Sequence, residues 1–254
     1  MYVITYKRMA PRDWNAPSYE RVSAPLEAMG RDVLDRLVLR GDERVLDAGC
    51  GTGRVTAALL ERLPAGEVVA VDGSPAMVET ARAALPSERV QVRVVDLLEL
   101  ELDPPADAIL STATFHWIAD HDRLFARLGA ALVPGGRLVA QCGGEGNVSA
   151  VRRAIARVAH SSLVQWPGPW NFASVPGTER RLAAAGFSDV WCWPQHVRVV
   201  PDDLGEYLAT VMLGSHLERL EATDRVPFVH AVAVALEDDG IDYVRLNILA
   251  RRPF

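Results

Sequence analysis

The chain has 254 residues, of which 49% are hydrophobic and 24% charged, and these values are ordinary for a globular protein. Its formal net charge of -6 offers no basic patch of the kind that binds nucleic acid, so we expect no nucleic-acid partner. The apolar runs are too short to span a bilayer and the first residues lack a signal-peptide core, so we expect a cytoplasmic protein with no membrane partner. Cys50, Cys142 and Cys192 have no metal-ligand spacing, which favours reduced thiols and no bound metal.

Apolar segments of strand length alternate with segments of helical periodicity from about residue 25 onward, which predicts a parallel sheet with crossover helices. The expected strands are 44–47, 68–72, 90–95, 108–112, 137–142, 190–200 and 243–250. The expected helices are 25–39, one from the glycine-rich loop to 63, 75–85, one between Asp120 and Pro134, 148–163, 178–185, and two or three between 202 and 237.

Two residues are expected to cap helices at their N-termini. Ser74 precedes Pro75, a favoured first helical residue, and Asp120 precedes the helix between the fourth and fifth strands. That helix is expected to end at Pro134-Gly135-Gly136, because proline and glycine disfavour its continuation. His121, at its start, is expected to be exposed to solvent.

A glycine-rich loop, Gly49-Cys50-Gly51-Thr52-Gly53, joins the first strand to the next helix. Glycines there permit a tight turn and let a ligand approach the backbone N–H groups at the helix start. The spacing G-x-G-x-G lacks the third glycine of the dinucleotide fingerprint G-x-G-x-x-G, because Arg54 follows Gly53. The loop therefore indicates a nucleotide-like ligand without identifying it.

Aspartates end three successive predicted strands: Asp47, Asp72 and Asp96. The carboxyl ends of parallel strands meet at one edge of the sheet, where such folds bind ligands. Asp72 follows the loop by about twenty residues, where a carboxylate can accept hydrogen bonds from both ribose hydroxyls. The alternative is that it only closes the following turn.

At three places the sequence resembles the class I S-adenosylmethionine-dependent methyltransferases. The matching segments are Val45 to Gly53, Val69 to Met77, and Leu132 to Leu138, at the family's spacing. Trp14-Asn15 to Tyr19 and Thr114-Phe115-His116-Trp117-Ile118 are similar to the trans-aconitate methyltransferase group, whose members and relatives methylate carboxylates. The resemblance covers roughly residues 25–145 and weakens beyond them.

This resemblance implies a fold. We expect an α/β, doubly wound, mostly parallel seven-stranded sheet of the Rossmann-like methyltransferase type, with strand order 3-2-1-4-5-7-6, an antiparallel last strand and a helical cap. We expect one methyltransferase domain over 1–254. Its parts are an N-terminal flap (1–24), a cofactor-binding core (25–145), cap insertions (146–176 and 201–239) and the final strands of the sheet (177–200 and 240–254).

The resemblance also implies a cofactor, S-adenosyl-L-methionine. Gly49, Gly51 and Gly53 would line its methionine part, Asp72 would hold the ribose, and Met77 would lie beside the adenine. The implied cofactor-binding residues are Asp47, Gly49, Cys50, Gly51, Gly53, Asp72, Gly73, Met77, Asp96, Leu97 and Thr112.

His116 is the candidate catalytic residue because it follows the fourth strand at the expected ligand-binding edge. As a general base it would suit a hydroxyl acceptor, whereas as a hydrogen-bond donor it would suit a carboxylate, which is already ionised at neutral pH. A third possibility is that Phe115-His116-Trp117 only packs the edge of the core. The family resemblance favours positioning over base catalysis.

Aromatic residues are expected to line the substrate site, and these candidates are Trp14, Tyr19, His116, Trp117 and Trp166. Trp14 and Tyr19 are expected to form a flap that excludes water, or else to anchor an N-terminal arm. An acceptor carboxylate would be bound by an arginine. The candidates for that role are Arg21, Arg152, Arg153, Arg180 and Arg181.

The sequence thus predicts an S-adenosylmethionine-dependent methyltransferase that transfers a methyl group to a carboxylate or hydroxyl oxygen of a small organic acceptor. The alternatives are methylation of carbon or nitrogen in a small molecule, a nicotinamide-dependent oxidoreductase, and a cofactor-binding protein without activity.

Overall fold

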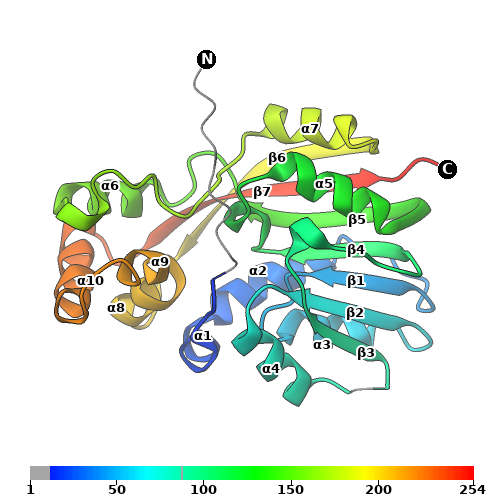
Figure 1. The fold of residues 1–254 in the computed structure, drawn as a ribbon, viewed down its shortest axis with the longest axis horizontal. Coiled ribbons are helices and arrows are strands. Elements are labelled where there is room, and N and C mark those ends of the chain that lie inside the picture. The colour runs from blue at the N-terminus through cyan, green and yellow to red at the C-terminus, as the bar shows by residue number, and fades with distance from the viewer. Residues whose placement is uncertain (1–11, 87) are drawn as a thin grey trace.

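The computed structural model describes residues 12–86 and 88–254. A seven-stranded sheet in the order β3-β2-β1-β4-β5-β7-β6 forms its centre. β7 is antiparallel to both of its neighbours, and the other adjacent pairs are parallel (Figure 1). The strands are β1 (Arg44–Ala48), β2 (Glu67–Asp72), β3 (Val90–Val94), β4 (Ala106–Thr112), β5 (Leu132–Gly143), β6 (Ser188–Val199) and β7 (Ile241–Arg251). The expected fold class and strand order are therefore confirmed.

Helices cover both faces of the sheet. On one face, α5 and α7 pack with β1, β4, β5 and β7 around residues such as Ile109 and Leu128. On the other, α2, α3 and α4 pack around Leu34, Leu59 and Ala81. These helices are α2 (Ala24–Leu34), α3 (Arg54–Glu61), α4 (Pro75–Ala84), α5 (His121–Ala130) and α7 (Val175–Ala184).

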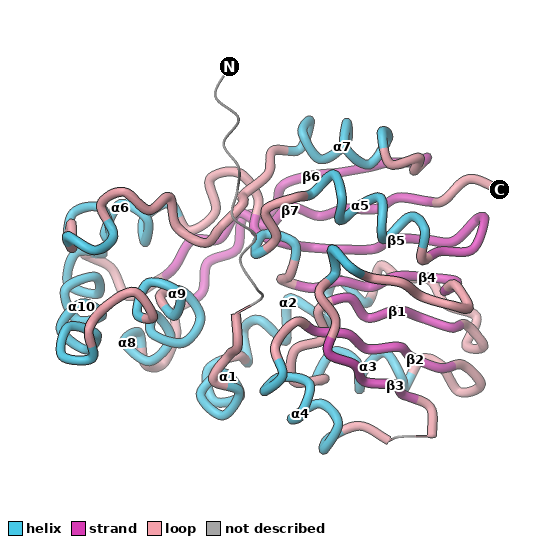
Figure 2. Tube along the Cα trace, viewed as in Figure 1, coloured by secondary structure: helices cyan, strands magenta, loops and turns pink. Residues whose placement is uncertain are grey.

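Four further helices form a second layer beyond one end of the sheet (Figure 2). Their apolar side chains make a separate core with Tyr243 of β7 and Met29 of α2. They are α6 (Ser149–Val158), α8 (Leu204–Tyr207), α9 (Gly214–Leu217) and α10 (Ala222–Leu236), with a π-helical turn at Leu208–Met212. We call them the cap helices; the parallel strands point toward them, so the cap lies at the carboxyl edge of the sheet (Figure 1). Along the described chain, every helix is too short or too polar to cross a bilayer.

Both predicted N-caps are confirmed. The Ser74 hydroxyl accepts a hydrogen bond from the N–H of Met77 at 3.3 Å, and Asp120 accepts one from the N–H of Arg123 at 2.9 Å. Each satisfies one of the N–H groups that a helix start leaves without an intrahelical partner.

Several predicted boundaries were wrong. The helix expected over 25–39 ends at Leu34, because the next N–H groups bond three residues back and Leu37 turns into the core. The helix expected over 148–163 ends at Val158, where Ala159 adopts a φ of 48°. The helix expected over 178–185 begins at Val175, capped by Ser174.

The segment Pro134-Gly135-Gly136 lies inside β5 and does not end a helix. The pairing of β4 with β5 shifts register between Ala106 and Ala108, and Gly135 has a φ of 76°. Proline is tolerated at such an irregularity because it has no N–H to donate to the sheet. A further difference is α1 (Ala16–Val22), a helix inside the segment expected to form a flap. Asn15 caps it by accepting from the N–H of Ser18.

Candidate active site

The glycine-rich loop joins β1 to α3 at the carboxyl edge of the sheet, and all three glycines have positive φ angles. A Cβ atom on Gly49 would lie 2.0 Å from Oγ1 of Thr114, and one on Gly53 would lie 2.9 Å from Cδ1 of Leu85. A Cβ on Gly51 would meet nothing within 4 Å. Packing therefore accounts for two of the glycines, whereas the third faces open space that a ligand can fill.

Asp72 lies beside that open position. One of its carboxylate oxygens accepts a hydrogen bond from the N–H of Gly51 at 2.9 Å, and the other accepts one from the N–H of Ser74 at 2.8 Å. The Asp72 side chain thus closes the turn and also faces the glycine-rich loop. Closing the turn and binding a ribose are therefore compatible roles for this residue. A carboxylate offers about four acceptor positions, so Asp72 can also accept from a ligand hydroxyl.

Asp47 lies beneath the loop. Its carboxyl group is 1% exposed and accepts a hydrogen bond from the Thr56 hydroxyl at 2.6 Å. Burial raises the pKa of Asp47 to about 7, in opposition to that hydrogen bond. The residue ties β1 to α3 from within the protein.

The remaining expected cofactor residues surround the same edge. Asp96 lies two residues beyond the end of β3 and accepts a hydrogen bond from the N–H of Leu98 at 2.9 Å. β3 pairs with β2, and Asp72 lies opposite Val94, so Asp96 follows the strand next to the one that Asp72 ends. The side chains of Cys50, Met77 and Leu97 are all at least 92% buried.

The segment before α1 crosses the start of α4. The backbone N–H of Trp14 donates to the Ser74 hydroxyl at 3.1 Å, and that hydroxyl donates to the Asp13 carboxylate at 2.6 Å. The ring of Trp14 meets Tyr19 and Trp117 edge-on, with centroids 5.7 and 5.2 Å away. These contacts anchor the N-terminal segment next to Asp72 and bring three of the expected substrate residues together.

His116 lies in a single 3-10 turn, Phe115–Trp117, and is 6% exposed. Its Nδ1 accepts a hydrogen bond from the backbone N–H of Gly143 at 3.2 Å. Burial lowers the pKa of His116 well below its ordinary value, so the ring is neutral at physiological pH. In a neutral ring whose Nδ1 is an acceptor, Nε2 carries the proton, so this assignment makes Nε2 a donor.

An aromatic row extends from the N-terminal segment to the cap. Neighbouring rings have centroids 4.9 to 5.8 Å apart along the series Trp14, Trp117, His116, Phe172, Trp170, His216 and Trp166. Trp166 stands at the far end, where the Arg219 guanidinium lies 4.1 Å from its ring centroid. Trp166 therefore belongs to the same row as Trp14 but is remote from it.

Two expectations about polar residues need correction. His121 is 3% exposed, and its Nε2 lies 2.9 Å from the carbonyl oxygen of Phe115, so it is not a solvated residue. The five candidate arginines are on the surface or already paired; Arg21 binds Glu206 and Arg181 binds Asp122.

A deeply buried arginine lies elsewhere: Arg245 of β7, 2% exposed, which our reading of the sequence missed. The available signal was a charged residue within an apolar strand.

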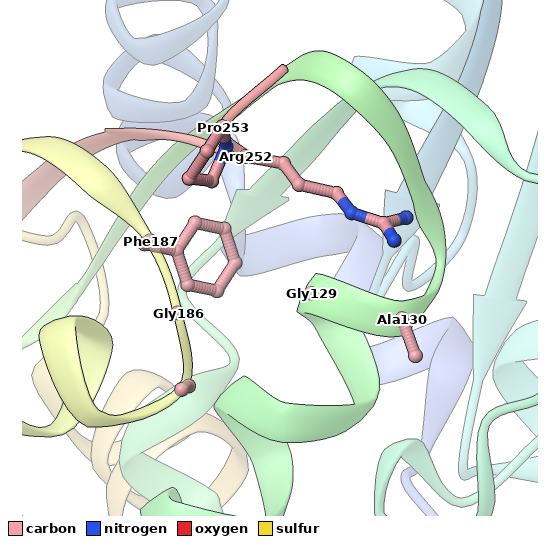
Figure 3. Close-up of a pocket in the computed structure, with 7 residues that line it drawn as sticks. Gly129, Ala130, Gly186, Phe187, Arg252 and Pro253 are labelled. Carbon is pink, nitrogen blue, oxygen red and sulfur yellow. The ribbon is translucent and has the colours of Figure 1, made fainter.

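A groove also exists at the opposite, amino edge of the sheet (Figure 3). It lies between the end of α5, the turn before β6 and the chain after β7, and is lined by Gly129, Ala130, Ala185, Gly186, Phe187, Arg252 and Pro253. None of these residues belongs to the glycine loop or the aromatic row.

All three cysteines are buried and free, and within the described ranges no three His, Cys, Asp or Glu side chains lie close enough to hold a metal ion.

Comparison with known proteins matches residues 45–136 to a family model described as a methyltransferase domain. A trans-aconitate 2-methyltransferase of Methylobacterium radiotolerans is 30% identical over 94% of this chain and 98% of its own length. Another of that name, from Azoarcus sp., is 31% identical over 90% of this chain and 89% of its own. Among solved structures, Haemonchus contortus phosphoethanolamine N-methyltransferase 2 in complex with S-adenosyl-L-methionine superposes with a TM-score of 0.66, at 18% identity, over 94% of this chain and 57% of its own.

Proposed function

The chain belongs to the S-adenosylmethionine-dependent methyltransferases, and we propose that it methylates a carboxylate oxygen of a small organic acid. S-adenosylmethionine is its cofactor. Two features fit this group: the open space over Gly51, which any side chain would occupy, and the Asp72 carboxylate, which suits the two ribose hydroxyls.

The protonation of the His116 ring is the observation that favours one class of acceptor. With Nδ1 accepting from Gly143, Nε2 already holds its proton and has no lone pair with which to remove another. An alcohol or phenol would need a base, because its own pKa is about 10 or higher. A carboxylate is ionised above a pH of about 4 and needs none. A donor at this position therefore favours a carboxylate.

The chain's residues then have three tasks. The cofactor supplies an activated methyl group when bound. The backbone of the glycine loop and Asp72 hold it at the sheet edge, and Trp14 and Tyr19 keep water away from it. His116 Nε2 donates to one oxygen of the acceptor carboxylate, which orients the other toward the methyl group; such alignment is worth about 7–11 kcal/mol in favourable cases.

The relatives support the same class of acceptor, since their names specify trans-aconitate. The superposed N-methyltransferase is 18% identical and supports the fold alone.

A screen for methyl acceptors tests the proposal. The enzyme is incubated with labelled S-adenosylmethionine and with matched panels of carboxylic acids, phenols and alcohols of similar skeleton. We expect base-labile methyl esters from the acids and no methylated product from the phenols or alcohols. Methyl ethers from the phenols or alcohols, with no ester, would contradict it.

A further inference from the structure

Arg245 is a buried cation that has no anionic partner among the residues that the structure describes. It is 2% exposed on β7, between Gly143 of β5 and Gln195 of β6. Its Nε donates to Oε1 of Gln141 at 3.2 Å. Within the described ranges, no carboxylate lies at ion-pair distance from this guanidinium. A buried charge without a partner is costly, so proteins keep one mainly where a ligand completes the pair.

The groups around Arg245 are neutral. Those that interact with it electrostatically include the thiol of Cys142 and the hydroxyls of Tyr243, Tyr207 and Tyr19. Burial raises the pKa of each of them, to about 12 for Cys142 and for Tyr207, so none offsets the positive charge near neutral pH.

Two of these hydroxyls provide a further donor. Those of Tyr207 and Tyr243 are 2.6 Å apart, and both side chains are at least 98% buried. One of the two hydroxyl protons forms the bond between them. The other has no acceptor among the residues that the structure describes. Among the described residues, neither this O–H nor the two terminal nitrogens of Arg245 has a hydrogen-bond acceptor. A guanidinium with a neighbouring O–H donor is an arrangement that binds a carboxylate.

This cluster adjoins the methyl-transfer site. Gly143, which pairs with Arg245 across the two strands, is also the residue whose N–H bonds to His116. Tyr19 interacts electrostatically with both Arg245 and Asp72, so it is near both the cluster and the proposed cofactor position.

We infer that Arg245, together with the hydroxyls of Tyr207 and Tyr243, binds a second carboxylate of the acceptor, one that the reaction leaves unmethylated. This rests on the proposed function, because it assumes that the reacting group is itself a carboxylate. Methylation removes the charge of that group, so an arginine bound to it would stabilise the reactant more than the transition state. An arginine bound to the other carboxylate holds the substrate equally well throughout the reaction. Arg245 therefore selects small dicarboxylic or tricarboxylic acids over monocarboxylic ones.

The test compares wild type with Arg245→Met and Arg245→Lys. The substrates are trans-aconitate, a set of small dicarboxylic acids and the half-ester of each dicarboxylic acid. For wild type, each half-ester should have a KM at least about 100-fold above that of its diacid, which is the effect of losing one charged hydrogen-bonded pair. Arg245→Met should raise the KM of the diacid by a similar factor and abolish the preference, with a much smaller change in kcat. Arg245→Lys, which keeps the positive charge, should retain part of the preference for the diacid.

Binding measurements separate this inference from the proposed function. Thermal unfolding of the complex with S-adenosylhomocysteine should shift upward with a diacid for wild type, but not for Arg245→Met, even if no acid is methylated. The melting temperature of unliganded Arg245→Met should equal or exceed that of wild type, because a buried unpaired charge has been removed. The control is Arg198→Met. Arg198 is an exposed arginine of the neighbouring strand β6 that is bound to Asp238, and this variant should behave as wild type.

Two results would overturn the inference. One is an unchanged preference for diacids in Arg245→Met. The other is loss of the shift with S-adenosylhomocysteine alone, which would mean that Arg245 binds the carboxylate of the cofactor. If Arg245→Met does not fold, Tyr207→Phe provides the same comparison, with an expected rise in diacid KM of about tenfold.

Discussion

Nδ1 of His116 accepts a hydrogen bond from the backbone N–H of Gly143, at 3.2 Å. A backbone N–H cannot become an acceptor, so this bond favours one tautomer of the ring and aligns it with the end of β5. Burial lowers the pKa of His116 in the same structure, and the two effects together keep a neutral ring with its proton on Nε2.

His116→Leu should therefore lower kcat/KM by about 100-fold, because the donor that orients the reacting carboxylate toward the methyl group is lost. His116→Gln, whose side-chain amide retains an N–H, should lose less. The wild-type rate with a carboxylate acceptor should be flat from pH 6.5 to pH 9, because no histidine has to lose a proton. Initial rates across this range provide the measurement, and a rise through a pKa near 7 would indicate a base.

Gly51→Ala and Gly49→Ala form a matched pair in the glycine loop. Gly51 has a φ of 55° and open space at its Cβ position, so alanine there should cost only about 1–2 kcal/mol of stability. Its methyl group should nevertheless lower the affinity for S-adenosylhomocysteine at least tenfold. Gly49→Ala should unfold at a much lower temperature, since its Cβ would lie 2.0 Å from the Thr114 hydroxyl. Calorimetric binding and thermal unfolding distinguish the two effects, and equal behaviour of both variants would argue against a ligand over Gly51.

Asp72→Ala should abolish the thermal shift that S-adenosylhomocysteine produces. Saturation of wild type at 100 times the dissociation constant should stabilise the fold by about 2.7 kcal/mol. The control is Asp107→Ala, which removes an acceptor for the N–H of Arg44 at the opposite edge of the sheet. It should lower the melting temperature yet keep the shift. A full shift in Asp72→Ala would place the ribose elsewhere.

Asp47→Asn should stabilise the protein at alkaline pH. The pKa of Asp47 is raised by burial from 3.8 to about 7, so between these values the folded state binds more protons than the unfolded state. Wild-type stability should therefore fall as pH rises from about 4 to 7, by up to about 1.4 kcal/mol per pH unit from this group. Asparagine still accepts the Thr56 bond and carries no charge. Denaturant unfolding should show Asp47→Asn more stable than wild type at pH 8.5, with a gap that narrows toward pH 5; a constant gap would contradict this origin.

His216 should contribute to acid sensitivity. Its ring lies 4.9 Å from that of Trp166 and 5.3 Å from that of Trp170, and burial lowers its pKa to about 4, assisted by Arg219 and Arg12. The unfolded state takes up this proton near pH 6.5, so stability is lost as pH falls from 6.5 to about 4. His216→Phe should reduce that loss by up to about 3 kcal/mol at pH 4. An identical pH dependence of unfolding in both proteins would exclude His216 as the cause.

The topology and the cofactor side of the site could be predicted because their determinants are local. Strand-length apolar runs, the N-cap Ser74 and the loop with Gly51 each lie within a few residues of what they specify. Arg245 could not be selected in this way. Its importance depends on the absence of an acid around it, and that is a property of β5, β6, β7 and the cap together.

The same distinction explains the errors of boundary. Pro134-Gly135-Gly136 has the composition of a helix stop, but α5 already ends at Ala130 and pairing with β4 draws the segment into the sheet. His121 looks polar in sequence, yet the carbonyl of Phe115 gives its ring a partner inside the protein. Both outcomes were decided by tertiary contacts that no local pattern encodes.

The position of β7 between β5 and β6 has a consequence for biosynthesis. Within the described sheet, β6 pairs only with β7, which is the last of the seven strands in the order of the chain. While the ribosome is still adding residues 188–240, β6 therefore has no neighbour and the far edge of β5 stays open. The glycine loop and Asp72 are complete well before that stage, whereas Arg245 arrives with the final strand. A nascent chain would thus complete the glycine loop and Asp72 before it adds the strand that carries Arg245.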